Sequence, residues 1–146
     1  MNLEDIMKEW EEDCVIGHRL DEVSQVTPQL HAKYLNLLTQ AKLTLKRLEA
    51  KQAKLLKNKF LWYNGKMPRE DIKSLGWADD PFEGLKVMKG DLDIWYNSDD
   101  ELQQSEALIA YYKTMIDTVR EMVDTLKWRH QTVKNIIEVR KFEAGV

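Results

Sequence analysis

Seven cations within residues 42–59 are the side chains whose type and spacing point most directly to a chemical role. An α-helix turns by about 100° per residue, so six of the seven fall within an arc of roughly 180°. These six are Lys42, Lys46, Arg47, Lys51, Lys54 and Lys57. Such a ladder extends for about 22 Å along a helix and can bind several phosphates of a nucleic-acid backbone.

Lys59 and the aromatic residues after it form the second part of this candidate site. Lys59 falls inside the apolar face of the same helix, so it either turns toward a ligand at the helix end or marks a frayed terminus. Cations beside aromatic side chains favour single strands, because unpaired bases offer flat faces for stacking. We therefore predict nucleic-acid contacts from Lys59, Trp62 and Tyr63. Packing of the aromatic residues, Phe60 included, in a core or an interface stays an open alternative.

Charge is distributed unevenly along the chain. The net charge of −3 is the balance of −5 in residues 1–41, +7 in 42–66, −7 in 67–106 and +2 in 107–146. A basic block between acidic blocks indicates a local anion-binding surface, or else internal pairing of the lysine face with residues 67–106.

The sequence carries no motif of catalysis or metal binding. It has no glycine-rich phosphate loop, no Gly-x-Ser-x-Gly elbow and no His-Glu-x-x-His motif, and its three histidines are far apart. The single cysteine, Cys14, excludes an internal disulfide and is consistent with a reducing compartment. No apolar run reaches the ~18 residues of a membrane span. We predict a non-enzymatic protein without cofactor, metal or membrane.

Helical periodicity runs through most of the chain and predicts an all-α fold. Thr27 and Pro28 form a helix-start signal, and neither Gly nor Pro follows until Gly65. We therefore predict a long helix from about residue 28 to 63. A helix of this length in a chain of 146 residues favours a helical hairpin or a coiled coil.

The segments before and after this helix have different characters. A first helix is expected over residues 3–16, and a connector or short helical turn over residues 18–26. Residues 66–98 are acidic and contain most of the Gly and Pro residues, so a loop-rich connector is expected there. Within it, we predict two helical turns from Pro68 to Leu75 and an extended segment from Asp91 to Tyr96.

A third long helix is predicted to begin at Ser98, with Ser98 as its N-cap. It is either continuous or bent near residues 127–130, where its apolar stripe is interrupted. Its stripe is the candidate oligomerisation surface and comprises Leu108, Tyr112, Met115, Ile116, Val119, Met122, Val123, Leu126, Val133, Ile136 and Ile137. The expected organisation is therefore residues 1–65 with the basic helix, 66–98 as connector, and 99–146 for assembly.

Several short segments along the chain have a characteristic order and spacing. These segments are Leu3-Glu4-Asp5, Lys33-Tyr34-Leu35-Asn36, Leu48-Glu49-Ala50, Leu56-Lys57-Asn58-Lys59 followed by Tyr63 and Gly65, and Phe142-Glu143-Ala144-Gly145. Through these segments and the shared C-terminus the sequence resembles the UvsY recombination mediators of T-even-like phages, whereas residues 66–98 match the family poorly.

The resemblance implies a protein that binds single-stranded DNA and assembles into a ring-shaped homo-oligomer of about six subunits. It implies that the protein helps a RecA-like recombinase load onto strands covered by the phage single-strand-binding protein, in the cytoplasm of the infected bacterial host. The family's basic Lys-x-Arg pair corresponds to Lys57 and Lys59, and a lysine at the second position loses bidentate phosphate geometry. In the family the C-terminal helix drives assembly. The alternative from another class is a helical scaffold that does not bind DNA.

Overall fold

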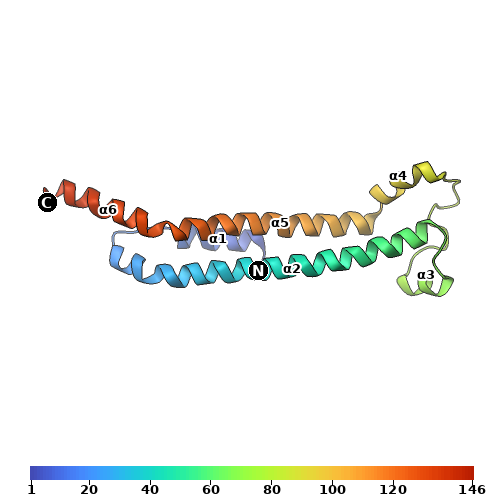
Figure 1. Cartoon of the computed structure of the whole chain (residues 1–146), viewed down its shortest axis with the longest axis horizontal. Coiled ribbons are helices and arrows are strands. Elements are labelled where there is room, and N and C mark those ends of the chain that lie inside the picture. Colours follow the sequence, from blue (N-terminus) through green and yellow to red (C-terminus); the bar gives the residue numbers. More distant parts are fainter. The chain divides into compact units, whose positions relative to one another are not determined.

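The structure is a computed structural model that describes residues 1–146 and contains only helices and loops. Its helices are α1 (Leu3–Asp13), α2 (Leu20–Tyr63), α3 (Arg69–Leu75), α4 (Leu92–Asn97), α5 (Asp100–Lys127) and α6 (Arg129–Glu143), with a 3-10 turn at Lys89–Asp91 (Figure 1). The predicted all-α fold is confirmed. No helix combines the length and the apolar character needed to cross a bilayer, and no cluster of side chains is arranged to hold a metal ion.

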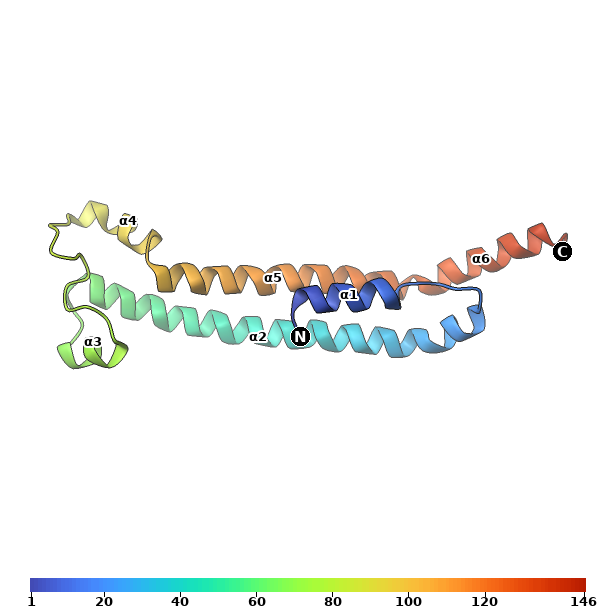
Figure 2. The same cartoon turned by 180° about the vertical axis from the view of Figure 1, so that it is seen from behind.

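The chain forms two compact units. The first unit contains residues 1–43 and 112–146, and the second contains residues 44–111. These boundaries differ from the divisions at 65 and 98 that composition indicates, because α2 and α5 each contribute to both units. In the first unit, α1 lies alongside the parts of α2 and α5 that belong to it (Figures 1 and 2). In the second unit, α3 and α4 lie where α2 ends and α5 begins (Figure 1).

Asp13, at the end of α1, joins this helix to α2 in the first unit. Its carboxylate accepts hydrogen bonds from Lys33 Nζ at 2.6 Å and from Tyr34 Oη at 2.8 Å. Tyr34 has no exposed surface, and its ring lies edge-on to Trp10 with the centroids 5.1 Å apart. Burial by itself raises the pKa of Asp13. The hydrogen bonds from Lys33 and Tyr34 outweigh this effect, so the pKa of Asp13 lies below its ordinary value.

The start of α2 differs from the prediction. The helix begins at Leu20, and Pro28 lies inside it, so Thr27 is not an N-cap. Thr27 Oγ1 instead donates back to the carbonyl oxygen of Val23 at 2.6 Å. Leu20 and Val23 are buried in a cluster with Val133. This tertiary packing extends the helix past the local start signal, since the burial of an apolar face provides most of a helix's stability.

The connector is more helical than expected. The two helical turns predicted from Pro68 to Leu75 are confirmed by α3, which ends at Gly76 in a left-handed conformation with φ 73°. The extended segment predicted for residues 91–96 is wrong, because α4 occupies Leu92–Asn97. Trp95 of α4 lies edge-on to Phe82 with the ring centroids 5.2 Å apart. A helical turn can place Trp95 against this ring without the partner strand that an extended segment would require.

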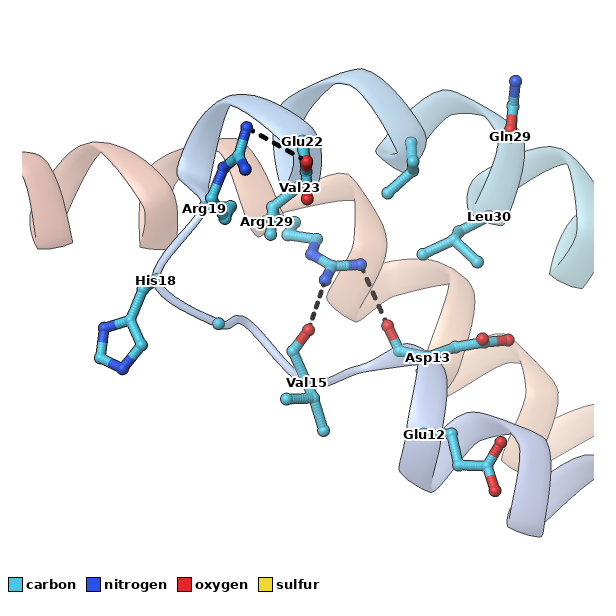
Figure 3. A pocket seen from close by; sticks show the side chains of 12 residues that line it. Glu12, Asp13, Val15, His18, Arg19, Glu22, Val23, Gln29, Leu30 and Arg129 are labelled. Atoms are coloured by element: carbon cyan, nitrogen blue, oxygen red, sulfur yellow. Dashed lines mark hydrogen bonds and ion pairs between the residues drawn. The ribbon is translucent and has the colours of Figure 1, made fainter.

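Of the two alternatives for the third long helix, continuous or bent near residues 127–130, the structure shows the second. α5 ends at Lys127, and α6 begins at Arg129. The Arg129 guanidinium is buried and donates to the carbonyl oxygens of Asp13 at 3.3 Å and Val15 at 3.0 Å (Figure 3). Arg129 therefore satisfies main-chain acceptors at the end of α1, which stops at Asp13 rather than near residue 16.

Candidate nucleic-acid interface

The predicted cationic ladder lies on the exposed side of α2. Five of its members belong to the second unit: Lys46, Arg47, Lys51, Lys54 and Lys57. All five side chains are exposed, and none forms an ion pair with a carboxylate. Lys42, in the first unit, is likewise exposed and unpaired. Closely spaced charges of one sign repel each other, so phosphates bound along this basic face would relieve that repulsion.

Lys59 is not part of this basic face, which corrects the expectation for it. Only 3% of the residue is exposed, and Nζ lies 3.6 Å from Glu101 Oε1 in addition to its closer partner, Asp99. The ammonium group also lies over two indole rings, 4.1 Å from the Trp77 centroid and 4.7 Å from that of Trp62. Lys59 neither reaches a surface ligand nor frays. It occupies the buried side of α2 because carboxylates and aromatic rings replace the water around its charge.

Asp99 completes this buried polar cluster and is the N-cap of α5, a role that we predicted for Ser98. Its Oδ1 accepts from the backbone N–H of Leu102 at 3.0 Å, and its Oδ2 accepts from Tyr63 Oη at 2.6 Å. Burial opposes ionisation of Asp99, but the hydrogen bonds from Tyr63, Leu102 and Lys59 outweigh it and lower the pKa of its carboxyl group. Burial and the bond to Asp99 raise the pKa of Tyr63.

Trp62 and Tyr63 pack inside the second unit, as the alternative of core packing allows. Tyr63 is only 6% exposed, and its ring lies 5.0 Å from that of Tyr96 and 5.8 Å from that of Phe82. Trp62 donates from Nε1 to the carbonyl oxygen of Ala78 at 2.9 Å. Tyr63 therefore offers no open face to bases, whereas Trp62 is half-buried and is bonded to the connector through Ala78.

Phe60 is the aromatic residue that the structure places at the surface. It is 49% exposed, and Lys66 Nζ lies 5.6 Å from its ring centroid. The list of predicted contacts omits Phe60, although a signal for it exists in the sequence. Phe60 lies 18 positions after Lys42, which is about five whole turns of helix, so both residues have the same angular position.

Most of the predicted oligomerisation stripe is buried inside the chain itself. The residues with almost no exposed surface are Met115, Ile116, Val119, Met122, Val123, Leu126 and Val133. Tyr112 and Ile136 are half-buried, whereas Leu108 and Ile137 are exposed. The α6 helix also exposes Val139 and Phe142, at 55% and 85%, which the stripe omits. The stripe thus keeps two exposed members, and Val139 and Phe142 add to the exposed apolar side chains of α6.

Comparison with known proteins agrees with this architecture. A family model described as "Recombination, repair and ssDNA binding protein UvsY" matches residues 9–146. The recombination protein uvsY of Enterobacteria phage T4 is 26% identical over 146 residues, with 99% of each chain covered. Two crystal structures of the bacteriophage T4 recombination mediator protein UvsY, from lattice types II and IV, are similar in fold.

The first of these structures has a TM-score of 0.81 at 24% identity and covers 99% of this chain and 98% of that chain. The second has a TM-score of 0.78 at 23% identity and covers 98% and 99%. Likeness at this identity shows the shared fold, and the family model extends over almost the whole sequence. The chain therefore belongs to the UvsY family of recombination, repair and single-stranded-DNA-binding proteins.

Proposed function

We propose that this chain binds single-stranded DNA along the basic face of α2 and acts as a recombination mediator. The observation that carries the proposal is the set of five exposed cations in residues 46–57, none of which has a carboxylate partner. Each bound phosphate would release about 0.7 counterions from a single strand, so engagement of all five cations predicts a log–log salt slope near −3.5 per subunit.

Phe60 supports a single strand as the ligand in preference to a duplex. Its exposed ring lies in the same helix as the basic face, three residues after Lys57. Stacking of an unpaired base on an aromatic ring contributes about 1–3 kcal/mol and tolerates any sequence. A duplex hides the faces of its bases, so Phe60 would gain nothing from it. We therefore expect the affinity to depend strongly on salt concentration and only weakly on nucleotide sequence.

The proposed cellular role is to help a RecA-like recombinase load onto strands covered by the phage single-strand-binding protein, in the cytoplasm of the infected host. This role requires no catalysis by the chain itself. It requires that the strand be held tightly and then released to the recombinase. Several basic faces in one assembly would bind the strand tightly through avidity. Once one face has bound, the strand is at a high effective concentration for the next face.

Self-assembly into a ring is the corresponding structural proposal. Ile137, Val139 and Phe142 of α6 are exposed large apolar side chains, with Phe142 at 85%. Contact with a different surface of a second copy, as a ring requires, would remove these side chains from water, at roughly 25 cal/mol per Å² of apolar surface. We therefore place the assembly surface on α6, where Ile137 is the exposed member of the stripe predicted from sequence.

The test compares two variants that each lack five cations. In the first, Lys46, Arg47, Lys51, Lys54 and Lys57 are replaced by Ala. In the second, the replaced residues are Lys8, Lys73, Lys86, Lys89 and Lys113, which are also exposed and form no ion pair. Fluorescence anisotropy with a labelled single strand at graded salt should show a slope close to zero for the first variant. The second variant, with the same net charge, should keep a slope near −3.5.

Equal binding by both variants would overturn the proposed interface. Failure of the unmodified chain to bind would favour a scaffold that does not contact DNA. The mediator role has its own measurement, which is the DNA-dependent ATPase rate of a RecA-like recombinase on strands saturated with single-strand-binding protein. Addition of this chain should raise that rate, and the variant without the basic face should not.

A further inference from the structure

A groove in the second unit runs beside the basic face, between α2 and α5. It has a volume of about 300 Å³. Leu48, Lys51 and Leu55 come from α2, at positions that share one helix face. Gln104 and Leu108 are among the residues that α5 contributes, again from one face. The groove is thus formed by two regular helix faces and needs no loop to complete it.

Three leucines give the groove its apolar walls, and two of its uncharged polar side chains are free. Leu48 and Leu55 are half-buried, and Leu108 is 44% exposed. The side chains of Gln104 and Ser105, which also line the groove, form no hydrogen bond within the chain. An amide and a hydroxyl group can each both donate and accept, so together they can satisfy the polar edge of a planar ligand.

Of the two charged residues that line the groove, Glu101 has partners within the chain and Lys51 has none. Glu101 Oε1 is already occupied, because it accepts from Trp77 Nε1 at 2.6 Å and lies 3.6 Å from Lys59 Nζ. Lys51 has no partner and belongs both to the groove and to the basic face. The groove therefore presents one free cation to the strand, at the edge where the proposed phosphate track passes.

We propose that this groove holds one unstacked nucleobase of the bound strand, an inference that rests on the proposed function. The base would contact Leu48, Leu55 and Leu108 with its apolar faces and Gln104 and Ser105 with its polar edge. Lys51 would bind the phosphate of the same nucleotide. A volume of about 300 Å³ is at the lower limit of ligand pockets, which suits a single base and is too small for a peptide helix.

This placement adds α5 to the DNA-binding surface. The basic face and Phe60 are both on α2. If the strand contacted only these residues, α5 would have no role in DNA binding. A base inserted between the helices fixes the distance of the strand from α2. Since the amide of Gln104 can rotate to match either a donor or an acceptor, the groove accepts any of the four bases. The strand would thus be held by its bases without sequence preference.

The test uses two strands of equal length and charge, oligothymidylate and the same strand with abasic sites. The variant combines Gln104→Ala with Leu108→Ala. Its matched control combines Gln25→Ala with Leu85→Ala, which removes an exposed glutamine and an exposed leucine outside the groove. For the unmodified chain, affinity should be higher for the strand with bases. In the groove variant the ratio of the two affinities should fall about fivefold or more, while affinity for the abasic strand stays unchanged.

An unchanged ratio in the groove variant would overturn the groove as a base site. Failure of the unmodified chain to bind either strand would instead overturn the proposed function, so the two failures are distinguishable. A groove variant with a lower assembly mass by sedimentation would show that a second copy fills the groove, which also overturns the proposal. As a second measurement, a strand with a base-attached photoreactive group should crosslink to α5 residues 104–108, and crosslinks to α2 alone would contradict it.

Discussion

Lys59 Nζ lies 3.0 Å from Asp99 Oδ2, and both side chains are almost completely buried. This ion pair joins the last turns of α2 to the N-cap of α5 within the second unit. Lys59 therefore stabilises the fold, whereas the cations on the opposite side of α2 remain free to bind a ligand. The following predictions depend on this division.

Asp99→Asn should lower the free energy of unfolding by up to about 3–5 kcal/mol, because the buried Lys59 ammonium loses its nearer counter-charge and keeps only Glu101, at 3.6 Å. Asn is as good an N-cap as Asp, so the substitution changes the charge and keeps the cap of α5. Chemical denaturation followed by circular dichroism measures the effect. Asp100→Asn, at the adjacent exposed position, is the control and should change stability by less than about 0.5 kcal/mol.

Acid should destabilise the protein through Asp13 and Asp99. The pKa of each carboxyl group in the folded chain lies below its ordinary value of 3.8. The unfolded chain therefore binds protons at a higher pH than the folded chain does. The stability that these groups contribute is complete above about pH 5 and is lost as the pH falls below about 4 through the folded pKa values. Melting temperatures measured down to about pH 2 should show this loss, and Asp99→Asn should reduce its size.

Lys57 and Lys59, two positions apart, should respond to substitution in opposite ways. Lys57→Ala removes an exposed cation, so the salt slope of strand binding should become shallower by about 0.7 with stability almost unchanged. Lys59→Met removes a buried partner of Asp99, so stability should fall while the slope stays the same. Salt titrations of both variants at a temperature where both are folded make the comparison. A change of slope in Lys59→Met would contradict the assignment of Lys59 to the fold.

Arg129→Met should loosen the junction between α1 and α6. The guanidinium donates to two main-chain carbonyl groups, and each such charge-assisted bond contributes about 1.5–3 kcal/mol. Hydrogen exchange of the amides in residues 14–19 should become faster in the variant. Arg129→Lys should restore only part of the protection, because a lysine lacks the planar fork that reaches both carbonyls. Unchanged exchange would show that the segment is held by its own packing.

Phe142→Asp should reduce the size of the assembly without unfolding the chain. The Phe142 side chain is 85% exposed, so a charge there has no cost in the isolated subunit but opposes contact between apolar surfaces. Sedimentation velocity should show a smaller species with unchanged helical content. Val119→Asp is the contrasting variant, because Val119 is completely buried and a charge there should abolish the fold. A Phe142→Asp variant with its original mass would place the interface elsewhere.

Part of the candidate site could be predicted from the helical wheel alone. Lys46, Arg47, Lys51, Lys54 and Lys57 are exposed as the wheel indicates, because angular position along one helix depends only on residue spacing. The same wheel puts Lys59 on the apolar side. It carries no information about what would surround a lysine there, since that depends on a carboxylate 40 positions later in the chain.

The amino-acid sequence by itself determined the helical class and the basic face of α2, because both follow from periodicity within a single segment. Tertiary structure decided the rest. It set the start of α2 at Leu20, turned Tyr63 inward and buried Asp99, the N-cap of α5, against Lys59 and Tyr63. The physical reason is that each of these outcomes depends on contacts between residues distant in sequence, whose burial outweighs local preferences of about 1 kcal/mol or less.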